Sequence, residues 1–269
     1  MLYINSRLDK DMNKPHISKL RYKIITKDDV DYENASPVSL ENEIFRMTTE
    51  KSEVTFEMVK HFSSEQEARI ITDEFLHNWE IIIGLENDPD DIKFKFDRSE
   101  VIDLEPNQEE NNVNLSVSVS EHIQIVDHVT LHVSRHKYPD PPDRFSISPD
   151  VETMYLRYKA YREGRDTLLS MAYLLLTVSQ SKSTRKDVAE KLRIEKDILD
   201  KLGELCSTKG NEYEARKAPK NGIFIPLEQK EKEWVLAVCK LLIIRCGEYE
   251  FCGTENLSQI KMDSLPSLN

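Results

Sequence analysis

The feature that most constrains the fold is a proline-rich stretch in the middle of the chain. Residues 137–149 read Lys-Tyr-Pro-Asp-Pro-Pro-Asp-Arg-Phe-Ser-Ile-Ser-Pro and hold four of the eleven prolines. Proline fixes its own φ angle and disfavours helix at the residue before it, so a helix or a central strand cannot run through this stretch. It therefore predicts a stiff, extended connector between two separately folded parts of the 269-residue chain.

Residues 1–136 have the pattern of an antiparallel sheet. Apolar and polar residues alternate at 92–97, 112–119 and 122–136, as in strands with one buried and one wetter face. Segments 20–26, 43–49 and 53–60 are expected to form further strands. One helix is expected after Ser63 and Ser64, because apolar residues then recur at helical spacing from Ala68 to Ile83. We predict an α+β domain here.

Residues 150–252 predict an all-helical domain. Ser148, Pro149 and Asp150 form a typical helix start, and the first helix is expected to continue to about residue 180 with Gly164 inside it. The last long helix is expected from near residue 226 to about residue 246. Residues 253–269 are polar and predict a flexible tail. The fold class is thus α+β, with a mostly antiparallel-sheet domain and one helix followed by an all-helical C-terminal domain.

Charge is divided unevenly between the two parts. Residues 1–150 carry 17 Lys and Arg against 31 Asp and Glu, a net charge of −14, whereas residues 151–269 carry 20 against 18, a net of +2. The acidic first part repels polyanions such as DNA, but the near-neutral second part can still contact them locally.

Composition also bears on the compartment. The longest apolar run, residues 168–178, is far shorter than the ~20 residues that span a bilayer, and the N-terminus lacks the layout of a signal peptide. The four cysteines, which all follow residue 205, are interpreted as buried reduced thiols. We expect a cytoplasmic protein with no membrane partner.

Residues 184–205 contain the most specific motif. Read as one helix, the segment would place Glu195 inside an apolar stripe that includes Val188 and Leu199, so a break into two helices near residues 193–195 is favoured. The segment resembles the helix-turn-helix pattern. Ala189 matches the small residue of its first helix, Ile194 the apolar turn residue, and Leu199 and Leu202 the apolar positions of its recognition helix. The chain departs from that pattern at Arg193, where many members have glycine, and at Glu195, which precedes the second helix.

The resemblance implies, as an alternative function, a nucleic-acid interface over residues 184–217. Its candidate contacts are the basic residues Arg185, Lys186, Arg193, Lys196, Lys201, Lys209, Arg216 and Lys217. The outward positions of the second helix, however, hold three acids against two bases, which gives little attraction to phosphate. Helix pairs of this kind also serve as protein-contact modules.

Catalytic and metal motifs are not found in the sequence. His122, His128, His132 and His136 share one face of the predicted long strand, but residues four apart on a strand are separated by ~13 Å, too far to bind one ion. Phosphate-binding glycine loops, nucleophile elbows and zinc-binding His-Glu-x-x-His motifs do not occur. We predict no metal, no cofactor and no catalytic residue.

The sequence therefore favours a non-enzymatic interaction or accessory protein, whose helical domain contacts a protein partner. One alternative is a nucleic-acid-binding protein that uses residues 184–217. A second alternative is an enzyme with a site between the two domains, where His128 or His132 would meet carboxylates and Arg216. The sequence leaves these three functions open.

Overall fold

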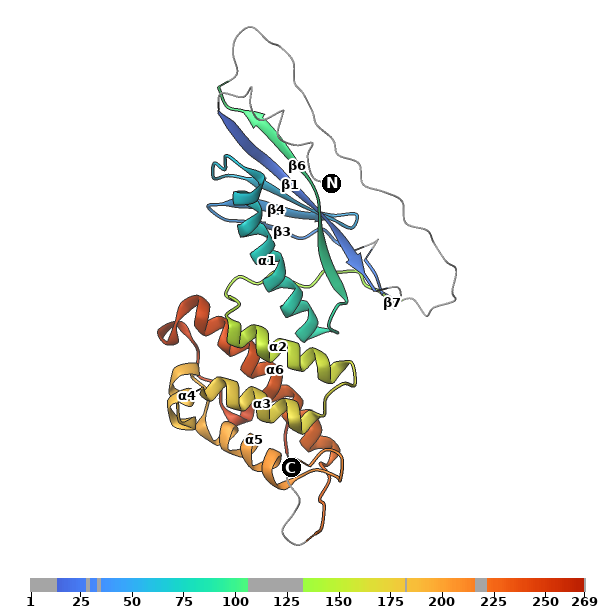
Figure 1. Cartoon of the computed structure of the whole chain (residues 1–269), viewed down its shortest axis with the longest axis vertical. Helices are drawn as coiled ribbons and strands as arrows, with labels where there is room; N and C mark the ends of the chain where they lie inside the picture. The colour runs from blue at the N-terminus through green and yellow to red at the C-terminus, as the bar shows by residue number, and fades with distance from the viewer. Residues whose placement is uncertain are drawn as a thin grey trace. The chain divides into compact units, whose positions relative to one another are not determined.

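The computed structural model describes residues 14–27, 30–32, 35–105, 133–181, 183–215 and 222–268. The chain divides into two compact units, Met1–Pro141 and Pro142–Asn269 (Figure 1). The division lies within the proline-rich stretch 137–149. Each unit has its own core and is described separately.

The first unit is built on a five-stranded antiparallel sheet in the order β3-β4-β5-β1-β6 (Figure 1). Its strands are β1 (Pro15–Thr26), β3 (Ser39–Glu41), β4 (Phe45–Glu50), β5 (Glu53–Met58) and β6 (Ile92–Asp103). The helix α1 (Glu65–Glu86) links β5 to β6. A separate parallel pair joins β2 (Val30–Asp31) to β7 (Val133–Ser134). The predicted strand at 112–119 and all but the end of the one at 122–136 lie outside the described residues.

Alternation along the strands decides which face is buried. β4 alternates strictly between buried and exposed residues, and Leu20 of β1 pairs with Phe56 of β5 on the buried face. The helix α1 packs on this face through residues such as Trp79, and Ser64 caps its N-terminus by accepting a hydrogen bond from the Glu67 N–H at 3.3 Å. On the polar face, ion pairs link neighbouring strands, as between Arg21 and Glu53 at 2.9 Å.

The second unit is helical. Its helices are α2 (Pro149–Arg162), α3 (Leu168–Gln180), α4 (Arg185–Leu192), α5 (Lys196–Thr208) and α6 (Gln229–Cys252), followed by the short 3-10 helices η2 (Thr254–Asn256) and η3 (Met262–Ser264). Together with the antiparallel sheet and α1 of the first unit, these helices confirm the predicted α+β class. The helix α6 extends six residues beyond the predicted end at residue 246.

The single helix predicted for residues 150–180 is wrong, because the chain turns between α2 and α3. Gly164 adopts φ +73°, a conformation that ends a helix and that glycine adopts without steric cost. Thr167 then caps α3 by accepting a hydrogen bond from the Ser170 N–H at 3.3 Å. The two shorter helices can each pack against α6, and α3 is buried on more than one side, as at Leu169 and Leu175.

Candidate functional site at helix α5 and the C-terminal segment

The segment that resembles a helix-turn-helix forms two helices, α4 and α5, joined by a three-residue turn. Thr184 and Asp187 begin α4 with a reciprocal capping box, in which each side chain accepts from the other residue's backbone N–H. Arg193 then takes a left-handed conformation with φ 53° and ψ 43°. Ile194 is buried and donates its N–H to the Ala189 carbonyl at 3.0 Å. Glu195 begins α5 without a side-chain capping bond.

Residues 253–268, here termed the C-terminal segment, bind to this turn. The Ile260 N–H donates to the Arg193 carbonyl at 2.8 Å, and the Glu195 N–H donates to the Ile260 carbonyl at 2.9 Å. The Glu195 carboxylate also accepts from the Met262 N–H at 2.7 Å. These bonds satisfy the Arg193 carbonyl at the end of α4 and the Glu195 N–H at the start of α5, which would otherwise lack hydrogen-bond partners.

The C-terminal segment is anchored at further points, which differs from the flexible tail expected for residues 253–269. The Thr254 hydroxyl donates to the Lys191 carbonyl at 2.8 Å, Leu257 is buried, and Ser258 accepts from the guanidinium of the buried Arg245 at 3.1 Å. The polar composition of the segment does not predict this, because its partners lie outside it in the sequence, as with the Lys191 carbonyl 63 positions from Thr254.

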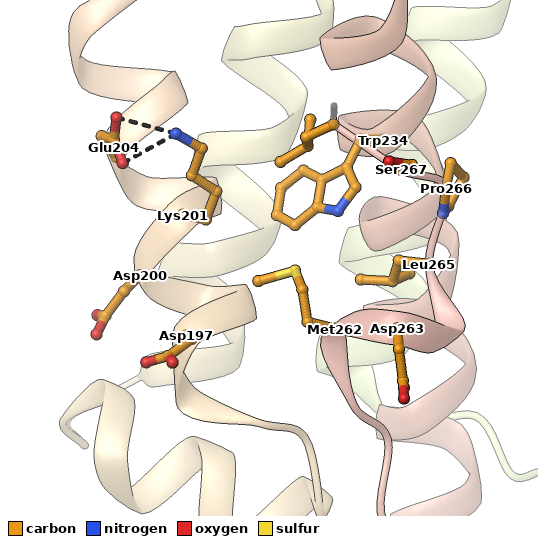
Figure 2. Close-up of a pocket in the computed structure, with 11 residues that line it drawn as sticks. Asp197, Asp200, Lys201, Glu204, Trp234, Met262, Asp263, Leu265, Pro266 and Ser267 are labelled. Atoms are coloured by element: carbon orange, nitrogen blue, oxygen red, sulfur yellow. Dashed lines mark hydrogen bonds and ion pairs between the residues drawn. The ribbon is translucent and has the colours of Figure 1, made fainter.

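The C-terminal segment and α5 enclose an open groove of about 770 Å³, here termed the α5 groove (Figure 2). Its walls are helix α5 on one side and η3 with the residues after it on the other, and Trp234 of α6 lies at its base. The lining residues are Asp197, Asp200, Lys201, Glu204, Trp234, Met262, Asp263, Leu265, Pro266, Ser267 and Leu268. Figure 2 shows the Met262 side chain extending beneath the indole ring of Trp234.

The lining of the α5 groove is acidic. It holds four carboxylates, those of Asp197, Asp200, Glu204 and Asp263, and one ammonium group, that of Lys201. Lys201 is itself paired with Glu204 at 3.1 Å (Figure 2). Asp197 and Asp263 stand on opposite walls, and neither has an ion-pair partner within the described part of the chain. Because Glu204 pairs with Lys201 and Asp200 pairs with Arg185 and Lys196, the excess negative charge of the groove rests on Asp197 and Asp263.

The basic residues predicted to contact nucleic acid mostly pair with nearby acids. Arg185 and Lys196 both bind Asp200, and these two cations lower the pKa of the Asp200 carboxyl, Lys196 having the larger effect. Lys186 pairs with Glu190 at 3.8 Å and Lys209 with Glu231 at 3.0 Å, in addition to the Lys201–Glu204 pair. Arg193 is exposed beside the turn. Arg216 and Lys217 lie outside the described residues.

Gly203 explains how Arg185 reaches α5. Gly203 is buried within α5, and a Cβ atom at this position would collide with the Arg185 guanidinium. The absence of a side chain lets Arg185 lie across α5 beside Asp200, at 3.1 Å. A cation that lies against a helix of its own chain and pairs with an acid there is poorly placed to contact phosphate.

Sequence reasoning missed the wall formed by the C-terminal segment. The signal that marks it is a recurrence of apolar residues in an otherwise polar stretch, at Leu257, Ile260, Met262, Leu265 and Leu268. Leu257 is buried, and Met262, Leu265 and Leu268 are half-buried. Such spacing indicates a segment that packs along a surface rather than one that is fully solvated.

Titratable groups outside the α5 groove do not form a second candidate site in the described residues. Groups of three or more His, Cys, Asp or Glu side chains that would hold a metal ion are not found among them. His136 is exposed, whereas His122, His128 and His132 lie outside the described part of the chain, and with them the histidines proposed for an inter-domain site. Burial raises the pKa of the Cys246 thiol to about 12 and raises that of Cys239, so both thiols stay protonated at neutral pH.

In the described residues, none of the helices has the length and apolar character needed to cross a bilayer. Comparisons with protein-family models, with curated proteins and with solved structures find no match.

Proposed function

We propose that this chain is a non-enzymatic interaction protein and that its helical unit binds a protein partner through the α5 groove. The observation that carries the proposal is the combination of an apolar base with an acidic rim on a concave surface. Exposed grooves of this composition are typical of peptide-recognition sites, in which apolar pockets supply affinity and peripheral charges supply specificity.

The alternative is nucleic-acid binding, and the two-helix arrangement with its tight turn favours it. Two features of the α5 surface weigh against it. The outward face of α5 presents Asp197, Asp200 and Glu204, which repel phosphate, and its bases are engaged by these or neighbouring acids. The C-terminal segment also stands beside α5 as a wall. It hinders the entry of α5 into the DNA major groove, which is about 12 Å wide.

Site-specific photocrosslinking tests the proposal. The photoreactive residue p-benzoylphenylalanine is placed at Glu204 in the groove or, as a matched control, at Glu250, which is exposed in the same unit but does not line the groove. The variants are irradiated in cells of the source organism. We expect discrete protein adducts from position 204 that are missing from position 250. Equal adduct patterns, or no adducts, would contradict a protein-binding role for the groove.

Fluorescence anisotropy with a random DNA duplex tests the alternative. The full-length chain is titrated from low to moderate salt, and we expect no binding. Tight binding that weakens steeply as salt rises would overturn the proposal in favour of nucleic-acid recognition by α4 and α5.

A further inference from the structure

We infer that the α5 groove binds a short lysine- or arginine-rich segment of a partner protein, with an apolar side chain of that segment inserted between its cations. The inference rests on the proposed function and deepens it by naming the chemistry of the partner. Charge complementarity, the spacing of the acids and the apolar base of the groove each support it.

Charge complementarity selects a cationic partner. The lining carries four carboxylates and one ammonium group; Lys201 pairs with Glu204, and Asp200 pairs with Arg185 and Lys196 from outside the lining, which leaves two uncompensated carboxylates. Asp197 and Asp263 stand on opposite walls without an ion-pair partner among the described residues, and Figure 2 shows Met262 between them. Two cations of one segment, one beside each of these carboxylates, would each meet a negative charge, whereas an acidic or phosphorylated segment would be repelled.

The spacing of the acids fits a peptide rather than a single small cation. Asp197, Asp200 and Glu204 lie at intervals of three and four residues, so they share one face of α5. Seven residues of α-helix extend over ~10 Å. Two or three cationic side chains on successive turns of a helix, or on alternate residues of an extended segment, cover the same distance.

The base of the groove favours an apolar anchor between those cations. Met262 and Leu265 are half-buried and line the groove beside the fully buried Trp234 (Figure 2). Methionine is flexible and polarizable, so it adapts to side chains of different shape. Covering such a surface with a leucine-sized side chain removes apolar area from water on both partners, which contributes free energy that charge alone does not supply.

The direct test uses a fluorescein-labelled peptide of Lys-Leu-Ala repeated four times, with the full-length chain. Two peptides of equal length serve as controls, one with Glu in place of Lys and one with Ala in place of Leu. We expect the Lys-Leu-Ala peptide to bind, the acidic peptide not to bind, and the peptide without leucine to bind more weakly. No binding of the Lys-Leu-Ala peptide would overturn the inference.

Variants of the chain then locate the binding site. The double variant Asp197→Asn with Asp263→Asn is expected to weaken peptide binding about five- to tenfold, because two ion pairs at a partly exposed site are lost. The matched control, Glu250→Gln with Glu255→Gln, changes the net charge equally at exposed positions outside the groove and is expected to leave binding unchanged. Met262→Ala is expected to weaken binding of the Lys-Leu-Ala peptide but not of the peptide without leucine.

Equal weakening by the groove variant and its matched control would overturn the inference, because it would show attraction to overall negative charge. The unfolding midpoint of each variant, followed by tryptophan emission, shows that the unit remains folded. Failure of this inference differs from failure of the proposed function. Protein adducts at position 204 without peptide binding would overturn the basic-segment chemistry alone, whereas the absence of both would overturn the function as well.

Discussion

Arg193 shows how a single residue can be held in a costly conformation by its neighbours. Its left-handed backbone, with φ 53°, costs an L-residue about 1–2 kcal/mol. Its carbonyl accepts a hydrogen bond from Ile260, and the adjacent Ile194 is buried. Glycine is common at the equivalent position of helix-turn-helix segments, and here the C-terminal segment stabilises the turn without it.

We expect Arg193→Gly to stabilise the helical unit by about 0.5–1 kcal/mol, because the relief of left-handed strain exceeds the extra chain entropy of glycine. Urea unfolding followed by tryptophan emission measures the change. Arg193→Ala is the control, since it removes the side chain but keeps the strain. If the glycine variant is no more stable than the alanine variant, the turn is not strained as described.

The ionisation of Glu231 makes the stability of the fold depend on pH, and the direction of this dependence follows from the pKa of its carboxyl. Burial opposes its ionisation, but the Glu228 N–H and the Lys209 ammonium outweigh burial, so the pKa of the Glu231 carboxyl falls below its usual 4.5. A carboxyl with a depressed folded-state pKa stabilises the fold above its unfolded pKa, and this contribution is lost as pH falls through the folded value.

Glu231→Gln is therefore expected to cost about 1 kcal/mol at pH 7, where the Lys209 ion pair is intact. The difference from the parent chain shrinks as pH falls below about 4.5. Urea unfolding at a series of pH values measures it. Glu233→Gln is the control, because Glu233 is an exposed acid on the same helix that accepts a hydrogen bond from Gln229. If the difference in unfolding free energy between Glu231→Gln and the parent chain stays constant with pH, the lowered pKa of Glu231 does not stabilise the fold.

Among the elements, the C-terminal segment has a role that its composition hides. It pairs with the α4–α5 turn through Ile260 and supplies one wall of the α5 groove through Met262 and Leu265. Helix α5 contributes the opposite wall with its polar face, while its apolar face is buried at Leu199 and Leu202. The groove therefore exists only while the C-terminal segment is bound.

Hydrogen exchange tests this role. The amide of Ile260 donates to the Arg193 carbonyl, so it is expected to exchange at least about tenfold more slowly than in an unstructured chain. Mass spectrometry of peptides that cover residues 254–268 measures the rate, and a synthetic peptide of the same sequence supplies the reference. Equal rates in the protein and the peptide would show that the segment is not held.

For the whole molecule, the important fact is that two separate cores lie in one chain. The chain contains two tryptophans, and each belongs to a different core. Trp79 of α1 is fully buried in the sheet unit, and Trp234 of α6 is fully buried in the helical unit. Each residue therefore reports on its own unit.

We expect the two units to unfold in separate transitions. Trp79→Phe leaves Trp234 as the reporter of the helical unit, and Trp234→Phe leaves Trp79 as the reporter of the sheet unit. Because each core is held by its own contacts, the two urea midpoints should differ, and unfolding of the full chain should depart from a two-state curve. Coincident transitions in both variants and in far-ultraviolet circular dichroism would show a single cooperative unit instead.

Patterns that act over a few residues predicted much of the architecture. The division between the two units falls within the proline-rich stretch 137–149, the alternation at 92–97 predicted a strand that the structure contains in β6, and Ser64 caps α1 as expected. The misplaced charge of Glu195 predicted the break between α4 and α5. Each of these features depends on backbone preference or on the burial of nearby side chains, which neighbouring residues already determine.

Contacts between distant residues were decided by packing. Glu195 and Met262 are joined by a hydrogen bond although 67 positions separate them, and no local pattern marks either as the other's partner. The break at Gly164 likewise became necessary only when α2 and α3 both packed against α6. The α5 groove depends on three segments meeting in space, because its charge and shape come from side chains that only the packed core brings together.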